Sequence, residues 1–133
     1  MERTEFNKIF YHDVSIRDIH ILTDNKNSGK KIVFILESEE YHKIKCHILN
    51  VFSLQLECCF KVIGLDTILD VERLEPENDS FVQGEIETIK KYPDGINISK
   101  QIISYKITTN YGGIIKIILY NEEVFIEKVK DTI

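Results

Sequence analysis

The chain has 133 residues, of which 43% are hydrophobic and 29% are charged, and its formal net charge is −5. This composition excludes an intrinsically disordered chain, and no run approaches the roughly 18 apolar residues that a membrane-spanning helix needs. The acidic balance also argues against a nucleic-acid-binding protein, because contact with a phosphate backbone depends on clustered Lys and Arg.

Length and residue types together predict a single mainly β domain over residues 1–133. The chain contains 23 Ile and 8 Val but no Ala and no Trp. β-Branched residues fit a pleated, half-buried surface, whereas Ala is the best helix former. Turn signals recur at intervals typical of an antiparallel β-sandwich, roll or partly open barrel.

The cysteines and the first residues bear on the cellular compartment. Cys46, Cys58 and Cys59 are an odd number of thiols, which fits a reducing environment better than a set of disulfides. The start of the chain is mixed in charge and lacks the apolar core of a secretory signal peptide. We therefore expect a cytoplasmic protein.

The first third of the chain predicts a short helix followed by a β-hairpin. Apolar residues over 4–11 share one helical face. Alternation over 14–21 then slips by one residue near Arg17-Asp18, as a β-bulge would require. A polar turn over 24–29 leads into an almost wholly apolar strand over 31–36.

The middle third predicts further strands. Alternation over 41–60 indicates one long strand, or two strands joined by a bend near Asn50. The stretch 65–74 fits either a helix or a strand, and we favour the strand. After a loop over 76–79, residues 81–89 return to an alternation that predicts another strand.

The last third predicts a three-stranded meander. Strands over 103–109 and 115–119 flank a turn over 110–113. A second turn at Asn121-Glu122 would then lead to a third strand over 124–128.

His12 and Asp13 form the first candidate for chemistry, because an adjacent His and Asp occur in metal-dependent phosphohydrolases. Those enzymes surround the pair with further His and Asp ligands, and here the pair precedes a strand. We favour a structural role, in which a side chain of the pair bonds backbone groups and holds the first hairpin in register.

A soft-metal site is the second candidate, since zinc prefers the residue types of His42, Cys46, His47, Cys58 and Cys59. Paired Cys-x-x-Cys spacing is missing from the sequence, and alternation sends Cys46 and His47 to opposite faces of one strand. Buried apolar cysteines are therefore preferred, and we predict no metal and no cofactor.

The sequence also lacks the local motifs of nucleophilic and phosphate-binding enzymes. No serine sits in a Gly-x-Ser-x-Gly elbow, and no glycine-rich phosphate loop is present. We expect a protein that is not an enzyme.

One acidic segment carries the whole net charge. Between positions 66 and 87 the sequence holds eight acidic side chains and the single base Arg73, a net charge of −7, while the rest of the chain is at +2. The eight are Asp66, Asp70, Glu72, Glu75, Glu77, Asp79, Glu85 and Glu87. Such a segment favours association with a basic partner, although a solvated surface kept soluble by its charge is the simpler alternative.

The stretch Phe10-Tyr11-His12-Asp13-Val14-Ser15-Ile16-Arg17-Asp18-Ile19 supplies a resemblance. It is similar to the aromatic, His-Asp, Ile-x-x-Ile opening of small β-rich proteins of Gram-positive bacteria, some of which are grouped with immunity proteins of polymorphic toxin systems. The resemblance implies no catalytic residue. It implies a protein-binding role, with a toxin domain as the partner.

These observations lead to one leading hypothesis and two rivals. The leading hypothesis is a non-enzymatic protein-interaction module, an immunity protein in its narrower form, whose acidic segment covers a basic partner. A β-barrel or roll that binds a small ligand in its interior is the first rival. A metal-dependent hydrolase that uses His12 and Asp13 is the second.

Overall fold

The computed structural model describes residues 1–24, 29–57, 66–110 and 112–129. Antiparallel strands make up most of this part of the chain. The strands are β1 (Glu2–Thr4), β2 (Ser15–Asp24), β3 (Gly29–Ser38), β4 (His42–Glu57), β5 (Asp66–Leu74), β6 (Ile102–Thr109) and β7 (Ile114–Lys128). The helices are α1 (Phe6–Ile9), α2 (Ser80–Lys90) and α3 (Gly95–Ser99), with a 3₁₀ helix, η1 (Pro76–Asn78), before α2.

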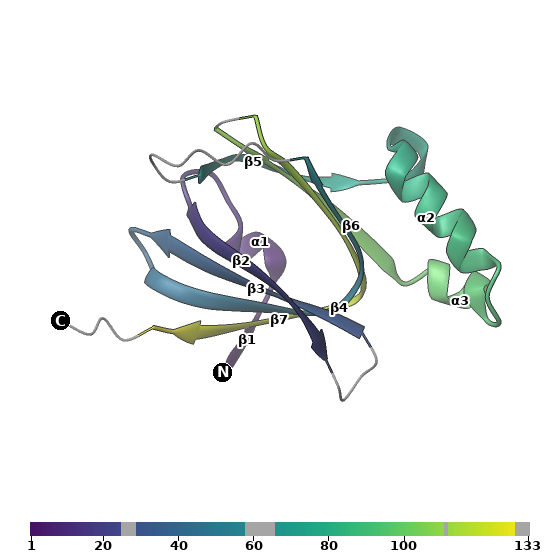
Figure 1. Cartoon of the computed structure of the whole chain (residues 1–133), viewed down its shortest axis with the longest axis horizontal. Coiled ribbons are helices and arrows are strands. Elements are labelled where there is room, and N and C mark those ends of the chain that lie inside the picture. The colour runs from purple at the N-terminus through teal and green to yellow at the C-terminus, as the bar shows by residue number, and fades with distance from the viewer. Residues whose placement is uncertain (25–28, 58–65, 111, 130–133) are drawn as a thin grey trace.

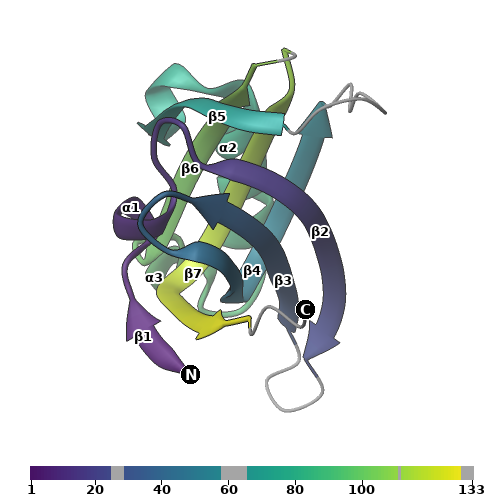
Figure 2. The same ribbon diagram turned by 90° about the vertical axis from the view of Figure 1, so that its left-hand side faces the viewer.

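The strands form one sheet that curls into a partly closed ring (Figure 1). Their order is β1-β7-β4-β3-β2-β5-β6, and β6 pairs again with β7. The contact between β2 and β5 is short, because the paired positions are Ser15 with Thr67 and Ile16 with Asp66. Beyond it β2 runs on beside β3 (Figure 2). The prediction of a mainly β, antiparallel, partly open fold is confirmed.

Several predicted elements are present at their expected places. The β2–β3 hairpin forms, and its register shifts between Ile16 and Asp18, as the slip in alternation predicted. The ambiguous stretch 65–74 is strand β5. The long segment after Tyr41 is one strand, β4, whose register shifts around Asn50, a residue with a φ of 57°.

The predicted strand over 81–89 is wrong, because these residues form helix α2. The apolar side chains that pack inward are spaced as a helix requires, at Val82, Ile86 and Ile89. Asp79 caps the helix by accepting a hydrogen bond from Val82 N at 3.0 Å. Glu residues happen to lie between apolar residues on this helix, and this produced the alternation over 81–89 that resembles a strand.

The predicted turn at Asn121-Glu122 is also wrong, because β7 continues through it and no third strand of a meander follows. Asn121 has a φ of 58°, so it bends the strand without reversing it. β4 accompanies β7 on both sides of the bend, from Ile44 opposite Lys128 to Glu57 opposite Ile114. Both strands bend at an asparagine, so pairing continues across the irregularity.

The N-terminal helix is shorter than the predicted 4–11, and it fills the interior of the ring. Phe6 of α1 stacks on Phe10 and on Tyr105, with ring centroids 4.3 Å and 4.0 Å apart. Phe10 and Phe34 form a T-shaped pair with ring centroids 5.0 Å apart. Glu122, just after the β7 bend, accepts hydrogen bonds from the Tyr105 hydroxyl and from Phe6 N. Burial and this carboxylate raise the pKa of Tyr105.

Helices α2 and α3 pack on the outside of the sheet (Figure 1). Leu74, Val82 and Ile118 form a second apolar cluster under α2. Gly95 is buried where α3 meets the end of α2, and a Cβ at this position would lie 2.0 Å from Ile89 O. In the part of the chain that the structure describes, no helix is long and apolar enough to span a membrane.

Candidate functional site

The acidic segment is distributed over three consecutive elements. Its members lie on β5, around η1 and on α2, in the order Asp70, Glu72, Glu75, Glu77, Asp79, Glu85 and Glu87. Asp66 begins β5 opposite Ile16, and its side chain lies outside the described part of the structure. The segment therefore runs along the outside of the ring from β5 to the helical side.

Three of these carboxylates are paired within the protein. Glu72 lies 3.5 Å from Lys106, and Glu75 lies 3.8 Å from Arg73. Asp79 lies 2.7 Å from Lys116. These ion pairs neutralise part of the negative charge of the segment within the protein. The net charge of the segment in the sequence did not show this.

The pairing with Lys106 and Lys116 has a topological cause. These two lysines stand directly opposite each other on β6 and β7. Like charges that face each other across a ladder are destabilising, and Glu72 and Asp79 offset this repulsion from either side. Sequence reasoning missed the two lysines, although each occupies an outward position in a strand of alternating Ile.

Asp79 is the most constrained of the predicted partner-binding residues. Its side chain is 9% exposed, and its oxygens accept from Val82 N at 3.0 Å and from Lys116 Nζ at 2.7 Å. Burial raises the pKa of Asp79, but the hydrogen bonds from Lys116 and Val82 lower it by more, so the net shift is downward. A partner has little access to this carboxylate, and its role is structural.

Four carboxylates of the segment enter none of the ion pairs among the described residues: Asp70, Glu77, Glu85 and Glu87. Asp70, Glu77 and Glu87 are exposed, and Glu85 is half-buried. We call these four the open carboxylates. Among the described members of the segment, they carry the negative charge that no ion pair neutralises.

His12 and Asp13 pair with each other at the surface. His12 Nδ1 lies 3.1 Å from Asp13 Oδ2, and the two side chains are 68% and 76% exposed. Asp13 has a φ of 74°, and its backbone N donates to Ile68 O at 2.9 Å. The link from this dipeptide to β5 is thus made by the backbone of Asp13.

The three described residues of the considered metal site do not come together. Cys46 is fully buried in the core, where burial raises its pKa, while His42 is exposed. His47 points to the outer face, with Nε2 at 3.2 Å from Glu127, and its Nδ1 has no hydrogen-bond partner among the residues that the structure describes. Burial lowers the pKa of His47, and this effect outweighs the hydrogen bond to Glu127, which raises it. Cys58 and Cys59 lie outside the described residues.

Within the described part of the chain, no three or more His, Cys, Asp or Glu side chains are grouped so that they could hold a metal ion. The chain was also compared with protein families, with curated proteins and with solved structures, and no match was found in any of the three comparisons.

Proposed function

We propose that this protein is a non-enzymatic, cytoplasmic protein-interaction module that binds a basic partner through its open carboxylates. The observation that carries the proposal is a set of four carboxylates that enter no ion pair among the described residues and lie on consecutive elements of the segment 66–87, outside which the chain has a net charge of +2. Acidic groups held on a folded framework attract a basic surface and orient it during association.

In its narrower form the proposal names the partner as a toxin domain and the protein as its immunity protein. The support for this form is the resemblance of residues 10–19 to the opening of small β-rich proteins of Gram-positive bacteria. The toxin domain would have a basic cleft that faces its nucleic acid or other substrate. The four carboxylates would cover that cleft, because their charge is opposite to its own.

Two observations bear on the rival functions. The interior of the ring is occupied by stacked rings of Phe6, Phe10 and Tyr105, which weighs against a small-ligand barrel. For a hydrolase, His12 and Asp13 line a cavity of about 480 Å³, but their side chains are 68% and 76% exposed, and among the described residues no group of three or more His, Cys, Asp or Glu could hold a metal ion.

Binding of the partner that co-purifies with the protein from its own cells tests the proposal. The triple variant Asp70→Asn, Glu77→Gln, Glu87→Gln removes three exposed open carboxylates. We expect its affinity to be about tenfold weaker at about 50 mM salt, with a smaller loss at about 300 mM, because salt screens exposed charges. Isothermal titration calorimetry provides the measurement.

A matched variant separates a local effect from a general change in charge. The changes Glu2→Gln, Glu39→Gln and Glu123→Gln also remove three carboxylates that enter no ion pair among the described residues, on β1, on the turn before β4 and on β7. This variant should bind as the native protein does. Equal affinity of all three proteins would contradict the proposal.

A further inference from the structure

Strand β2 has one long side that no described strand covers. Its residues from Asp18 to Asp24 pair with β3 on one side. On the other side β2 pairs with β5 only at Ser15 and Ile16, and it then runs on beside β3 (Figure 2). Among the residues that the structure describes, no strand pairs with this second side over 18–24. We call the second side of residues 18–24 the β2 edge.

The backbone along the β2 edge presents the hydrogen-bonding groups of a strand. Ile19 N donates to the side chain of its neighbour, Asp18 Oδ1, at 2.9 Å. A side chain can reach this N–H because it faces the β2 edge and not β3. N–H groups alternate between the two sides of an antiparallel strand, so Ile21 N and Thr23 N face the same way as Ile19 N. An extended segment placed there would complete a ladder of hydrogen bonds.

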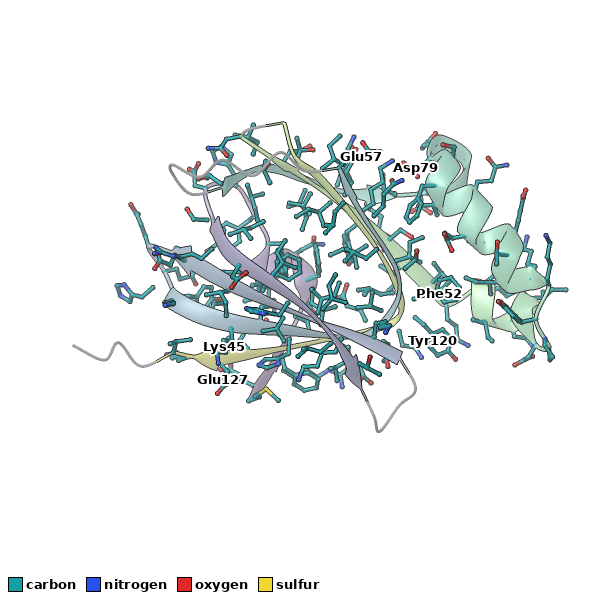
Figure 3. All side chains as sticks on the ribbon, viewed as in Figure 1. Lys45, Phe52, Glu57, Asp79, Tyr120 and Glu127 are labelled. Atoms are coloured by element: carbon teal, nitrogen blue, oxygen red, sulfur yellow. The ribbon has the colours of Figure 1, made fainter. Side chains whose placement is uncertain are left out.

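Large apolar side chains at the β2 edge are exposed to solvent. Ile21 is 53% exposed and Leu22 is 48% exposed. Phe52, another exposed apolar residue, lies between the strands and α3 (Figure 3), on a strand that pairs with both β3 and β7. Single exposed apolar residues are common on soluble proteins, but two of them beside unpaired backbone groups make an edge that binds another strand.

Two other stretches of the sheet that pair on one side are charged. β1, the first strand in the order of the sheet, has three residues, of which two are Glu2 and Arg3. After its contact with β2, strand β5 pairs among the described strands only with β6, and it carries Asp70 and Glu72. Short strands and charged side chains are the usual protection against pairing between molecules. Residues 19–23 of the β2 edge include no Asp, Glu, Lys, Arg or Pro.

The charged groups beside the β2 edge have partners within the protein. Asp18 Oδ2 lies 2.8 Å from His20 Nε2, and Arg17 Nη1 lies 2.8 Å from Glu37 Oε2. Lys30, on β3, donates from Nζ to a hydroxyl group of β2 at 3.1 Å. Two copies of one edge carry identical charges, so a strongly charged edge repels its own copy. The two positive and two negative side chains here balance, so an identical edge can approach.

We infer that the β2 edge binds the β2 edge of a second copy of this chain in antiparallel pairing, which joins two sheets into one. Residues 18–24 are centred on Ile21, so full overlap of two such edges has a single register. Ile21 then lies opposite Ile21 of the partner subunit, and Ile19 lies opposite Thr23 of the partner subunit. These are pairs of β-branched residues, which suit a sheet. Two-fold symmetry completes both edges at once, as in most protein dimers.

The same register predicts how the dimer responds to salt. Asp18 lies opposite Asp24 of the partner subunit at each end of the pairing, and like charges that face each other across a ladder are destabilising. Salt screens this repulsion, so the dimer should be tighter at high salt. This surface goes beyond the proposed function, which concerns a basic partner, other residues and an affinity that salt weakens.

Sedimentation equilibrium of the full chain between about 10 µM and about 1 mM tests the inference. We expect a monomer–dimer equilibrium, with more dimer at about 500 mM than at about 50 mM salt. Amide hydrogen exchange at the two ends of the concentration range locates the contact. Exchange at Ile21 and Thr23 should slow by at least about tenfold in the dimer, because their N–H groups enter the new ladder.

Variants at the centre of the β2 edge test the register. Ile21→Lys and Ile21→Glu should each weaken the dimer at least about tenfold, because like charges then face each other across the two-fold axis. A mixture of the two variants should associate again, since Lys then faces Glu. Leu69→Lys is the matched control, because Leu69 is 49% exposed and lies on β5, and this variant should dimerise as the native protein does.

The opposite results overturn the inference. They are a chain that stays monomeric at about 1 mM, including one that binds a strand of another protein instead, a dimer indifferent to Ile21→Lys, an equal loss in Leu69→Lys, or a mixture that does not associate. The triple variant of the open carboxylates Asp70, Glu77 and Glu87 tests the proposed function separately. It leaves the β2 edge unchanged, so failure of one idea leaves the other standing.

Discussion

At the scale of single residues, Asp79 shows how a carboxylate within an acidic segment becomes structural. One oxygen caps α2 and the other neutralises Lys116, and the side chain is 9% exposed. An N-cap contributes about 1 kcal/mol, and a buried charge that loses its partner costs more. Glu77, another carboxylate only two positions away, is exposed and enters no ion pair among the described residues.

Replacement of Asp79 by Ala should lower the free energy of unfolding by about 2 to 3 kcal/mol, since the cap is lost and Lys116 is left without its carboxylate. Urea denaturation followed by circular dichroism measures this change. The exposed control Glu77→Ala should change the value by no more than about 0.5 kcal/mol. A similar loss in both variants would contradict the structural role of Asp79.

The pH dependence of stability gives a further test of Asp79. Its pKa is lowered in the folded protein, so its contribution is complete above the unfolded pKa of about 4 and is lost as the pH falls through the lower folded value. The difference in unfolding free energy between the native protein and Asp79→Asn should therefore be constant near neutral pH and shrink below about pH 4. A difference that stays constant down to about pH 2 would contradict the assignment.

At the scale of elements, the junction of α2 and α3 depends on Gly95. The turn after α2 brings α3 back so closely that a Cβ at position 95 would lie 2.0 Å from Ile89 O and 2.9 Å from Lys90 Cα. Both atoms belong to the backbone, which cannot move aside as easily as the end of a flexible side chain. Gly84, in the exposed middle of α2, has nothing within 4 Å of the same added atom.

The two glycines make a matched pair of substitutions to Ala. Gly95→Ala should destabilise the protein by about 1 to 3 kcal/mol, because the helices must move apart. Gly84→Ala should stabilise it by about 0.5 to 1 kcal/mol, because Ala has the higher helix propensity. Thermal and urea unfolding would measure the loss of stability in Gly95→Ala and the gain in Gly84→Ala. A Gly95→Ala variant more stable than the native protein would contradict the close packing.

At the scale of the whole molecule, the ring is held by its filled interior as well as by strand pairing. The pairing between β2 and β5 is short, and Phe10 packs between the rings of Phe6 and Phe34, stacked on the first and T-shaped to the second. This aromatic contact links the N-terminal helix to the β2–β3 hairpin across the interior.

Phe10→Ala should therefore cost about 3 to 5 kcal/mol of unfolding free energy, the usual cost of removing a buried aromatic ring. Where this variant is too unstable to measure, Phe10→Leu should show a smaller loss of the same sign. Phe52→Leu is the control, because Phe52 is 38% exposed, and it should change stability by about 0.5 kcal/mol or less. An equal cost at both positions in urea denaturation would contradict the role of the interior stack.

The sequence predicted local features best within the strands of the sheet. Alternating Ile residues predicted β6 and the first half of β7, and a slip of one residue predicted the bulge before Asp18. Residues 81–89 were predicted as a strand from their alternation, although Val82, Ile86 and Ile89 also have the spacing of one helix face. Asn121 resembles a turn residue, but a neighbouring strand that bends at Asn50 keeps β7 paired.

The sequence by itself determined the β-rich character, the apolar strand pattern and the concentration of acidic charge between positions 66 and 87. Those properties follow from residue type and spacing, which act over a few positions along the chain. Tertiary structure decided which described carboxylates of this segment form ion pairs within the protein. Strand pairing places Lys106 beside Lys116, and helix packing brings Tyr92 near Phe52 and Tyr120. These contacts join residues far apart in the chain, so no local pattern records them.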